Sequence, residues 1–284
     1  MNKYLYIFLL IFTFSCDVQE EPFYNDFDSY INPEKKILIE DFTGHKCQNC
    51  PDASKEIKAI QNLYPNQVIA LAIHVSSFAK PNPLGNPYDY DFRTKWGNEI
   101  DNLFEISDEG LPAGMVNRVN YLDDNHRMGK DEWANAVNLE LKKSIDFRIQ
   151  TSCSNNNINI LVEVINSIEN THNIFVCLAE NNVINYQQDG SLTIEDYEHE
   201  HVLRSVIIDE SLSNEGEFNT GDIIEKSYSI DIDALENFNI TQSLNLPNGN
   251  GNAGGWDENN LTVITYVYNT VSKEIVQVEE VSLN

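Results

Sequence analysis

The sequence has few basic residues. Lysine and arginine together number 18 among 284 residues, against 45 aspartates and glutamates, so the formal net charge is −27. Repulsion of this size makes phosphate backbones and anionic headgroups poor partners. Nucleic acid binding is therefore excluded as a function class.

The sequence also lacks an apolar run long enough to cross a bilayer as a helix. The run at residues 4–14 has eleven residues, about half of what a span needs. The run follows Lys3 and is itself followed by Ser15, a small residue just before Cys16. This is the pattern of a secretory signal. It resembles a bacterial lipoprotein signal cut before Cys16, with that cysteine carrying the lipid. An ordinary signal peptide with an incidental cysteine is the alternative.

Cysteines are few, and their number, five, is odd. If Cys16 carries lipid and Cys47 and Cys50 form a dithiol, Cys153 and Cys177 remain. An exported chain permits a structural disulfide between these two. Two separate buried thiols are the equal alternative, because the sequence does not place their Cβ atoms within bonding range.

Charge and length suggest the division of the mature chain. Residues 16–35 are acidic, mixed with Asn, Ser and Pro, and are predicted to be a tether. The rest is long enough for two domains. We expect an α/β domain over residues 36–145 and a β domain over residues 146–284.

The most informative stretch is residues 37–53, ILIEDFTGHKCQNCPDA. A short apolar run predicts a buried strand, Thr43 and Gly44 break it, and the dithiol leads into a helix. Unpaired N–H groups at a helix start favour a thiolate, so Cys47 is the candidate nucleophile, and Cys50 can close a disulfide with it. A structural disulfide or a metal site is the alternative reading.

This corner resembles the active site of the thioredoxin superfamily. Asp41 stands six residues before Cys47, where the family keeps a buried carboxylate that moves protons for the second cysteine. Pro112, within residues 110–118, stands where the family has a cis-proline loop facing the dithiol. The family's tryptophan before the first cysteine is replaced by Lys46, which together with His45 is expected to favour a thiolate.

The remaining pattern up to residue 145 alternates between strand and helix. Residues 68–75 predict a central strand in which His74 is a partnered core residue, and residues 80–90, with three prolines, predict a long loop. Helices are expected over residues 92–104 and 130–143. This order is typical of an α/β layer domain with a mixed sheet.

After residue 146 the period changes to two, and long helices are not expected. Short strands at this spacing predict an antiparallel sandwich of immunoglobulin-like type. They are expected near residues 147–152, 158–165, 173–180, 201–209, 223–232, 261–268 and 274–281.

Two places in this half are candidate sites. His199 and His201 alternate along a predicted strand, which suits zinc only if a third ligand exists, so a solvated strand edge is favoured. Residues 248–257 form a glycine- and asparagine-rich loop presenting Trp256, a candidate peptide or glycan contact, although such loops are usually only connections.

The whole layout resembles the outer-membrane-protein-28-related lipoproteins of Bacteroidota. The matching segments are residues 40–51, 110–118 and 199–204. The resemblance implies an outer-membrane lipoprotein with a thioredoxin-like domain and an immunoglobulin-like one, at the cell surface or the periplasmic face.

Two functions are carried forward. The first is a thiol–disulfide oxidoreductase acting on extracytoplasmic proteins through Cys47, Cys50, Asp41 and Pro112. The second is a non-enzymatic lipoprotein that docks a partner at the outer membrane through its β half. Neither function requires a cofactor or a bound metal. In both, the expected partners are proteins and the membrane that holds the lipid anchor.

Overall fold

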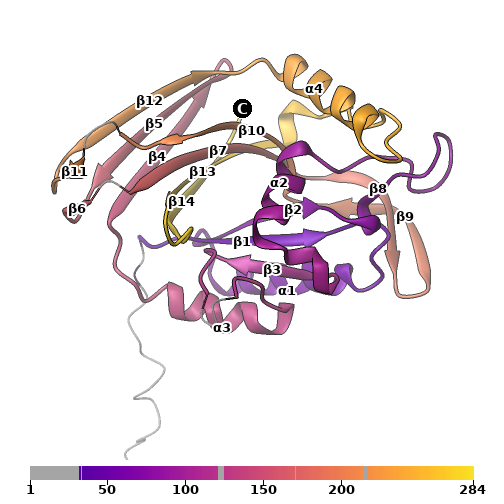
Figure 1. Cartoon of the computed structure of the whole chain (residues 1–284), viewed down its shortest axis with the longest axis horizontal. Coiled ribbons are helices and arrows are strands. Elements are labelled where there is room, and N and C mark those ends of the chain that lie inside the picture. The colour runs from indigo at the N-terminus through magenta and orange to yellow at the C-terminus, as the bar shows by residue number, and fades with distance from the viewer. Residues whose placement is uncertain (1–31, 33, 121–124, 170, 214–215) are drawn as a thin grey trace, which may run out of the picture. The chain divides into compact units, whose positions relative to one another are not determined.

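The main sheet of the computed structural model has seven strands, drawn from both sides of residue 146 (Figure 1). Their order is β14 (Ile275–Ser282), β13 (Leu261–Asn269), β7 (His172–Glu180), β10 (Val202–Ser211), β2 (Val68–His74), β1 (Ile37–Thr43) and β3 (Ala113–Val116). The structure describes residues 32, 34–120, 125–169, 171–213 and 216–284. The predicted signal, Cys16 and most of the tether lie outside these residues.

β1 is the central strand of the part of the sheet that carries the dithiol. It pairs in parallel with β2, Asp41 opposite Ala72, and antiparallel with β3, Phe42 opposite Ala113. All seven residues of β1 are buried because both faces of the sheet are covered here. The predicted strands over residues 37–39 and 68–75 are confirmed.

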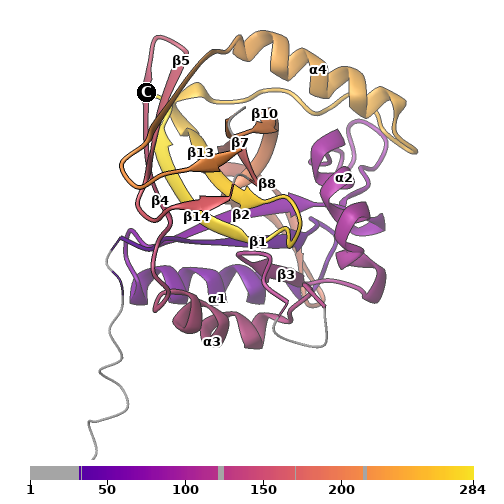
Figure 2. The same cartoon turned by 60° about the vertical axis from the view of Figure 1, so that its left-hand side comes forward.

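Helices cover one face of this region. α1 (Cys50–Leu63) and α3 (Lys130–Glu140) lie side by side beneath β1 (Figure 2). They bury an apolar core between helix and sheet that includes Ile57, Ile60 and Trp133. α2 (Lys95–Phe104) begins after Thr94, whose hydroxyl accepts the Gly97 N–H. The three helices confirm the expected alternation of strand and helix.

A second, three-stranded sheet forms another layer in the C-terminal half. Its order is β12 (Ile223–Ser229), β5 (Asn157–Val164) and β4 (Phe147–Ser154). Its inward side chains, such as Ile149 and Val162, share one apolar core with Val176 of β7 and Val263 of β13. Two sheets packed face to face explain the period-two pattern in this half.

The two halves share the main sheet. β10 runs parallel to β2 at the pair Val202–Ala72, and residues Ile31–Asn284 form one compact unit. A mixed α/β fold with a large mixed sheet and additional small sheets is therefore established. The division into domains at residues 36–145 and 146–284 stays a prediction.

Two elements of the C-terminal half differ from the expectation. The predicted absence of long helices is wrong, because α4 (Ile232–Asn245) follows β12, with the Asp231 side chain accepting the Ala234 N–H. A separate hairpin of β8 (Val183–Asp189) and β9 (Leu192–His199) lies between β7 and β10 in sequence. Two short strands, β6 (Ile168–Glu169) and β11 (Glu217–Phe218), pair antiparallel in a small sheet of their own.

Candidate functional site

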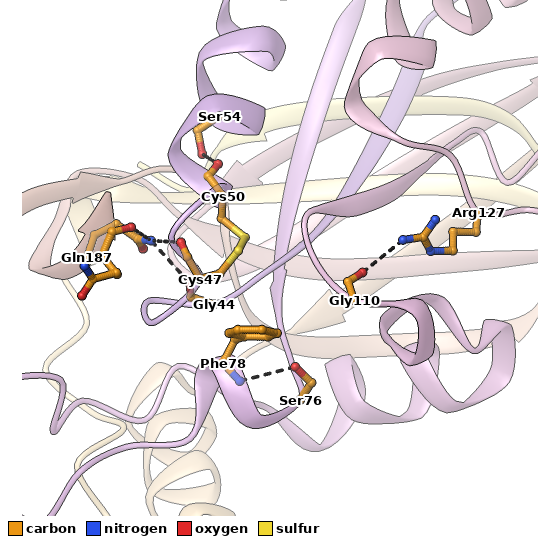
Figure 3. The surroundings of a disulfide bond; sticks show 10 residues. Gly44, Cys47, Cys50, Ser54, Ser76, Phe78, Gly110, Arg127 and Gln187 are labelled. Carbon is orange, nitrogen blue, oxygen red and sulfur yellow. Dashed lines mark hydrogen bonds between the residues drawn. A yellow bond between two sulfur atoms is a disulfide. The ribbon is translucent and has the colours of Figure 1, made fainter. Parts of the chain in front are cut away.

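The dithiol lies where the carboxyl end of β1 meets the start of α1 (Figure 3). Cys50 is the first residue of the helix, and Cys47 lies in the preceding turn, with the Cys50 N–H donated to the Cys47 carbonyl at 3.3 Å. The two sulfurs form a disulfide, with Cα atoms 5.4 Å apart. The helix start supplies the positive end of its dipole, which favours a thiolate on a nearby sulfur when the pair is reduced.

Asp41 is the titratable group of this corner. It lies on β1 and is 2% exposed, and among the described residues its Oδ1 has no hydrogen-bond partner. Burial raises the pKa of Asp41 to about 7 from its ordinary value of 3.8. A carboxyl group with such a pKa takes up and releases protons near neutral pH.

The Pro112 loop reaches the same end of β1. Pro112 directly precedes β3, which starts opposite Phe42, one residue before the end of β1. The Leu111–Pro112 peptide bond is cis, as the thioredoxin resemblance implies. The main-chain pairing thus brings this proline and the dithiol to one end of β1, although they are far apart in sequence.

Cys47 is covered rather than exposed, with only 2% of its surface accessible. The β8–β9 hairpin lies over it: the Gln187 Nε2 donates to the Cys47 carbonyl at 3.0 Å (Figure 3), and the N–H groups of Gln188 and Gly190 donate to the carbonyls of His45 and Gln48, both at 2.8 Å. The hairpin therefore closes one side of the dithiol loop.

Phe78 covers another side of the same loop. The Lys46 N–H donates to the Phe78 carbonyl at 3.0 Å. A Cβ atom on Gly44 would lie 2.6 Å from the Phe78 carbonyl carbon, so only glycine permits this approach. Because Cys47 is 2% exposed, an incoming protein meets it only if a segment that covers it moves.

The expected assistance from His45 is wrong. His45 is fully buried, and burial lowers its pKa to about 3, so the ring is neutral at physiological pH and brings no positive charge. Its Nε2 contacts the Lys80 carbonyl at 3.3 Å. Lys46 donates its ammonium to Asn82 Oδ1 at 2.8 Å, in the loop predicted over residues 80–90.

His199 and His201 are not on one solvated strand edge, and that expectation is wrong. β9 ends at His199, and the chain turns at His201, whose φ is 56°. His199 is 5% exposed, and burial lowers the pKa of each ring to about 4. Both histidines instead line a pocket of about 580 Å³ beside the disulfide, together with His74 of β2.

The pocket is bounded by α1, β1, β2 and the end of the hairpin. It receives Cys50, Asp41 and Tyr197 in addition to the histidines. Within the described ranges, no group of three or more His, Cys, Asp or Glu side chains is arranged to hold a metal ion. His74 is buried as expected and stacks on Phe92, with the ring centroids 4.5 Å apart. Its Nδ1 has no hydrogen-bond partner among the described residues.

Two other candidates have structural roles. Trp256 is 9% exposed and donates its indole N–H to the Ala253 carbonyl at 3.1 Å, so the expectation that its loop presents an aromatic contact is wrong. Cys153 and Cys177 are free thiols on β4 and β7, half-buried and buried respectively, so they do not form the disulfide that was one of the two alternatives.

Sequence reasoning missed Gln187 and Tyr197 because it missed the hairpin that carries them. The available signal was Asp189-Gly190, a dipeptide typical of tight hairpin turns, with short strands on either side.

Fold and site together define a mixed α/β protein with a CxxC disulfide at the start of a helix. The family model described as outer membrane protein Omp28 matches residues 99–284, more than half of the chain. The chain therefore belongs to the Omp28 family, which places it at the outer membrane. The match begins after the dithiol, so family membership by itself says nothing about Cys47 and Cys50.

Several solved structures are similar to this chain. HBP35 of Porphyromonas gingivalis has a TM-score of 0.57 at 17% identity, over 88% of this chain and 76% of that one. Protein AGR_C_4864 from Agrobacterium tumefaciens has a TM-score of 0.52 at 13% identity, over 88% of this chain and 95% of that one. At these identities the likeness shows the fold alone.

A domain of the outer membrane lipoprotein Omp28 from Porphyromonas gingivalis matches 50% of this chain and 91% of its own, with 14% identity and a TM-score of 0.25. Among curated proteins, none matches this sequence. In the part of the chain that the structure describes, no helix has both the length and the apolar character needed to cross a membrane.

Proposed function

We propose that this protein is an outer-membrane lipoprotein whose Cys47–Cys50 pair exchanges disulfides with exported proteins. The observation that carries the proposal is Asp41, a buried carboxyl group with a pKa near 7 at the same end of the sheet as the dithiol. A structural disulfide has no need of such a group, and burying its Oδ1 without a partner is costly. Perturbed carboxyls of this kind cluster at functional sites.

The reaction has two steps in the reduced protein. The Cys47 thiolate attacks a substrate disulfide, and the released substrate sulfur leaves with the electron pair of the broken bond. Asp41 then takes the proton of Cys50, whose thiolate attacks the Cys47 sulfur. This second attack forms the Cys47–Cys50 disulfide and releases the second substrate thiol. The Pro112 loop is assigned to hold the substrate main chain beside Cys47.

The arrangement of β1 supports a thioredoxin-like interpretation of residues 36–145. β1 precedes the dithiol, β2 is parallel to it, and β3 is antiparallel and follows Pro112. The packing of β4, β5 and β12 on the main sheet supports a sandwich of immunoglobulin-like type for residues 146–284. In this interpretation the two domains share the main sheet through β2 and β10.

Cys16 is proposed as the lipid attachment site. Membership of an outer membrane family and the short apolar run before Cys16 both support this assignment. Palmitate labelling of the protein, lost in a Cys16→Ser variant, and processing blocked by globomycin are the expected results. An unlabelled mature protein released from the membrane contradicts the anchor.

The oxidoreductase is tested by trapping its clients. In a Cys50→Ser variant the second step is blocked, so mixed disulfides between Cys47 and client proteins should accumulate and dissolve on reduction. The Cys47→Ser variant is the matched control and should trap none through Cys47. If insulin reduction by the wild-type protein is unchanged in Cys47→Ser, the proposed activity is wrong.

Burial of the disulfide favours a second candidate function. Cys47 and Cys50 are 2% and 1% exposed beneath the β8–β9 hairpin, which suits a disulfide that fixes this corner of the fold. The protein is then a non-enzymatic accessory that docks a partner at the outer membrane through its β half. An empty trapping experiment, with a Cys47 that titrates like a free thiol, supports this candidate.

A further inference from the structure

The pocket beside the disulfide reaches only one of the two cysteines. Cys50 contributes to its wall, whereas Cys47 lies under the β8–β9 hairpin. A volume of about 580 Å³ falls in the range of roughly 300–1,000 Å³ that is typical of small-molecule sites. A folded protein or a helix cannot enter a space of this size, but a small molecule can.

The pocket wall contains polar atoms without partners. Oδ1 of Asp41 and Nδ1 of His74 are both buried and have no hydrogen-bond partner among the described residues. Leaving such groups unpaired is unfavourable, and a ligand with hydrogen-bonding groups relieves this cost. The inner wall thus favours a small polar molecule over an apolar one.

The entrance carries charges of both signs. Lys55 and Lys58 line it from α1, and Glu198 and Glu200 line it from the end of the hairpin, all four being exposed residues. A mixed rim of this kind suits a molecule that carries an amino and a carboxylate group, such as an amino acid or a short peptide.

We propose that this pocket admits a low-molecular-weight aminothiol, which reduces the disulfide by attacking Cys50. The proposal rests on the proposed thiol–disulfide exchange and names the class of its reductant. Protein clients then meet Cys47 at the Pro112 side, while the electrons arrive at Cys50 from the pocket. The two half-reactions use different sulfurs and different faces of the site.

The reaction balances with two thiol molecules. Asp41, ionised in part near pH 7, takes the proton of the first thiol, whose sulfur attacks Cys50 as the bond to Cys47 breaks. Cys47 leaves as a thiolate beside the start of α1. A second thiol attacks the outer sulfur of the mixed disulfide, releasing a small disulfide and the Cys50 thiolate. The small thiols are oxidised, and the Cys47–Cys50 pair is reduced.

The test measures the reverse of the attack, using L-cystine as the probe. The full chain is prepared as Cys47→Ser, which leaves the Cys50 thiol, and as Cys50→Ser, which leaves the Cys47 thiol. Mass spectrometry of peptides gives the rate at which each thiol is cysteinylated, relative to the same variant unfolded in urea. Cys50 should react faster than Cys47 by roughly tenfold or more, because only Cys50 is reached from the pocket.

A blocking substitution tests the route. Ala72 lines the pocket from β2, and Ala59 lies exposed on α1 outside the pocket. In the Cys47→Ser background, Ala72→Leu should slow cysteinylation of Cys50 by about tenfold, whereas Ala59→Leu should leave it unchanged. If Ala72→Leu fails to fold by circular dichroism, Ser54→Leu, from the α1 wall of the same pocket, replaces it.

Two outcomes overturn the proposal: Cys47 reacts as fast as Cys50, or a folded blocking variant leaves the Cys50 rate unchanged. Both are independent of client trapping. Trapped clients together with a slow Cys50 leave the oxidoreductase standing and reject the pocket as its reductant site. Fast, blockable cysteinylation of Cys50 without trapped clients rejects the oxidoreductase and leaves the pocket as a thiol site.

Discussion

Arg118 donates two hydrogen bonds to Glu40, from Nε to Oε2 at 2.8 Å and from Nη2 to Oε1 at 2.6 Å. Both side chains are buried, and Nη2 also contacts the hydroxyl of Tyr266 at 2.7 Å. Glu40 lies on β1 and Arg118 just after β3, so the pair joins the dithiol strand to the strand that follows Pro112. Two of the segments that carried the family resemblance are thus partners in one ion pair.

Removing one partner of this pair should destabilise the protein strongly. Glu40→Gln leaves the Arg118 guanidinium buried without its counter-charge, and we expect the free energy of unfolding to fall by about 3 kcal/mol or more. Urea denaturation measures it. Glu279→Gln, which breaks the half-exposed pair with Lys36, is the control and should cost less than about 1 kcal/mol. Equal losses in the two variants contradict a buried, dominant role for Glu40.

The third family segment has a similar explanation. Arg204, the arginine of residues 199–204, donates to Glu180 at 2.6 Å and to the Tyr90 hydroxyl at 2.9 Å, and all three are buried. In the sequence, the nearby His199 and His201 suggested a zinc site or a solvated strand edge. The arginine instead ties β10 to β7 and to the loop before α2.

The sequence predicted those elements whose pattern is local. β1 begins with a short apolar run, β2 is a nearly continuous one, and α1 repeats apolar residues at Ala53, Ile57 and Ile60, so their positions follow from the local pattern. The placement of β10 beside β2 does not follow, because no residue pattern encodes which strands pair across the fold. The shared main sheet therefore escaped prediction.

The β8–β9 hairpin and α4 escaped because neither buries a regular face. In β8 only Gln187 is buried, and α4 buries only Ile232, Asn239 and Ser243. Without an apolar stripe, period-based reading finds neither a strand nor a helix. The candidate site was affected in turn: its cysteines, Asp41 and Pro112 were identified, but the hairpin that covers Cys47 and completes the pocket was not.

Asp41 should make the protein less stable as pH rises. Its pKa is raised by burial to about 7 in the folded state from 3.8, so the folded state holds its proton more tightly than the unfolded chain. The contribution of this proton to the free energy of unfolding is fully present below about pH 4 and is lost as pH rises through 7. The full contribution is on the order of 4 kcal/mol. Asp41→Asn should therefore be more stable than the wild type at pH 8.

Urea denaturation of wild type and Asp41→Asn at pH 5 and pH 8 tests this sign. The free energy of unfolding of Asp41→Asn, relative to that of the wild type, should be lower at pH 5 than at pH 8 by on the order of 2 kcal/mol. A pH-independent difference between the two proteins contradicts the raised pKa and indicates that Asp41 is ionised in the folded state throughout this range.

The pocket histidines His199 and His201 should act in the opposite direction. Burial lowers the pKa of His199 and of His201 to about 4 from 6.5, so the unfolded chain binds these protons first on acidification. Stability contributed by the neutral rings is present above about pH 6.5 and is lost as pH falls toward 4. Each ring contributes a slope approaching about 1.4 kcal/mol per pH unit.

His201→Asn isolates one of these rings. Asparagine tolerates the positive φ of 56° at this position, so the backbone is retained. Relative to its own value at pH 8, the variant should lose less stability than wild type at pH 4.5, by on the order of 2 kcal/mol. Parallel pH profiles for the two proteins contradict a neutral ring with a lowered pKa at this position.

Gln187 should control access to Cys47. Its Nε2 donates to the carbonyls of Cys47 at 3.0 Å and Gly44 at 3.4 Å, and so holds the hairpin against the dithiol loop. Gln187→Ala removes the side-chain hydrogen bonds between the hairpin and these two carbonyls, which weakens the closed arrangement by about 1–2 kcal/mol. In the Cys50→Ser background, alkylation of Cys47 by iodoacetamide should then accelerate by roughly tenfold.

The matched control is Gln188→Ala. The Gln188 side chain contacts Tyr88 and Gly190 but not the dithiol loop, so the alkylation rate of Cys47 should stay near that of the parent. Equal rates in all three proteins mean that Cys47 is reached without any opening of the hairpin.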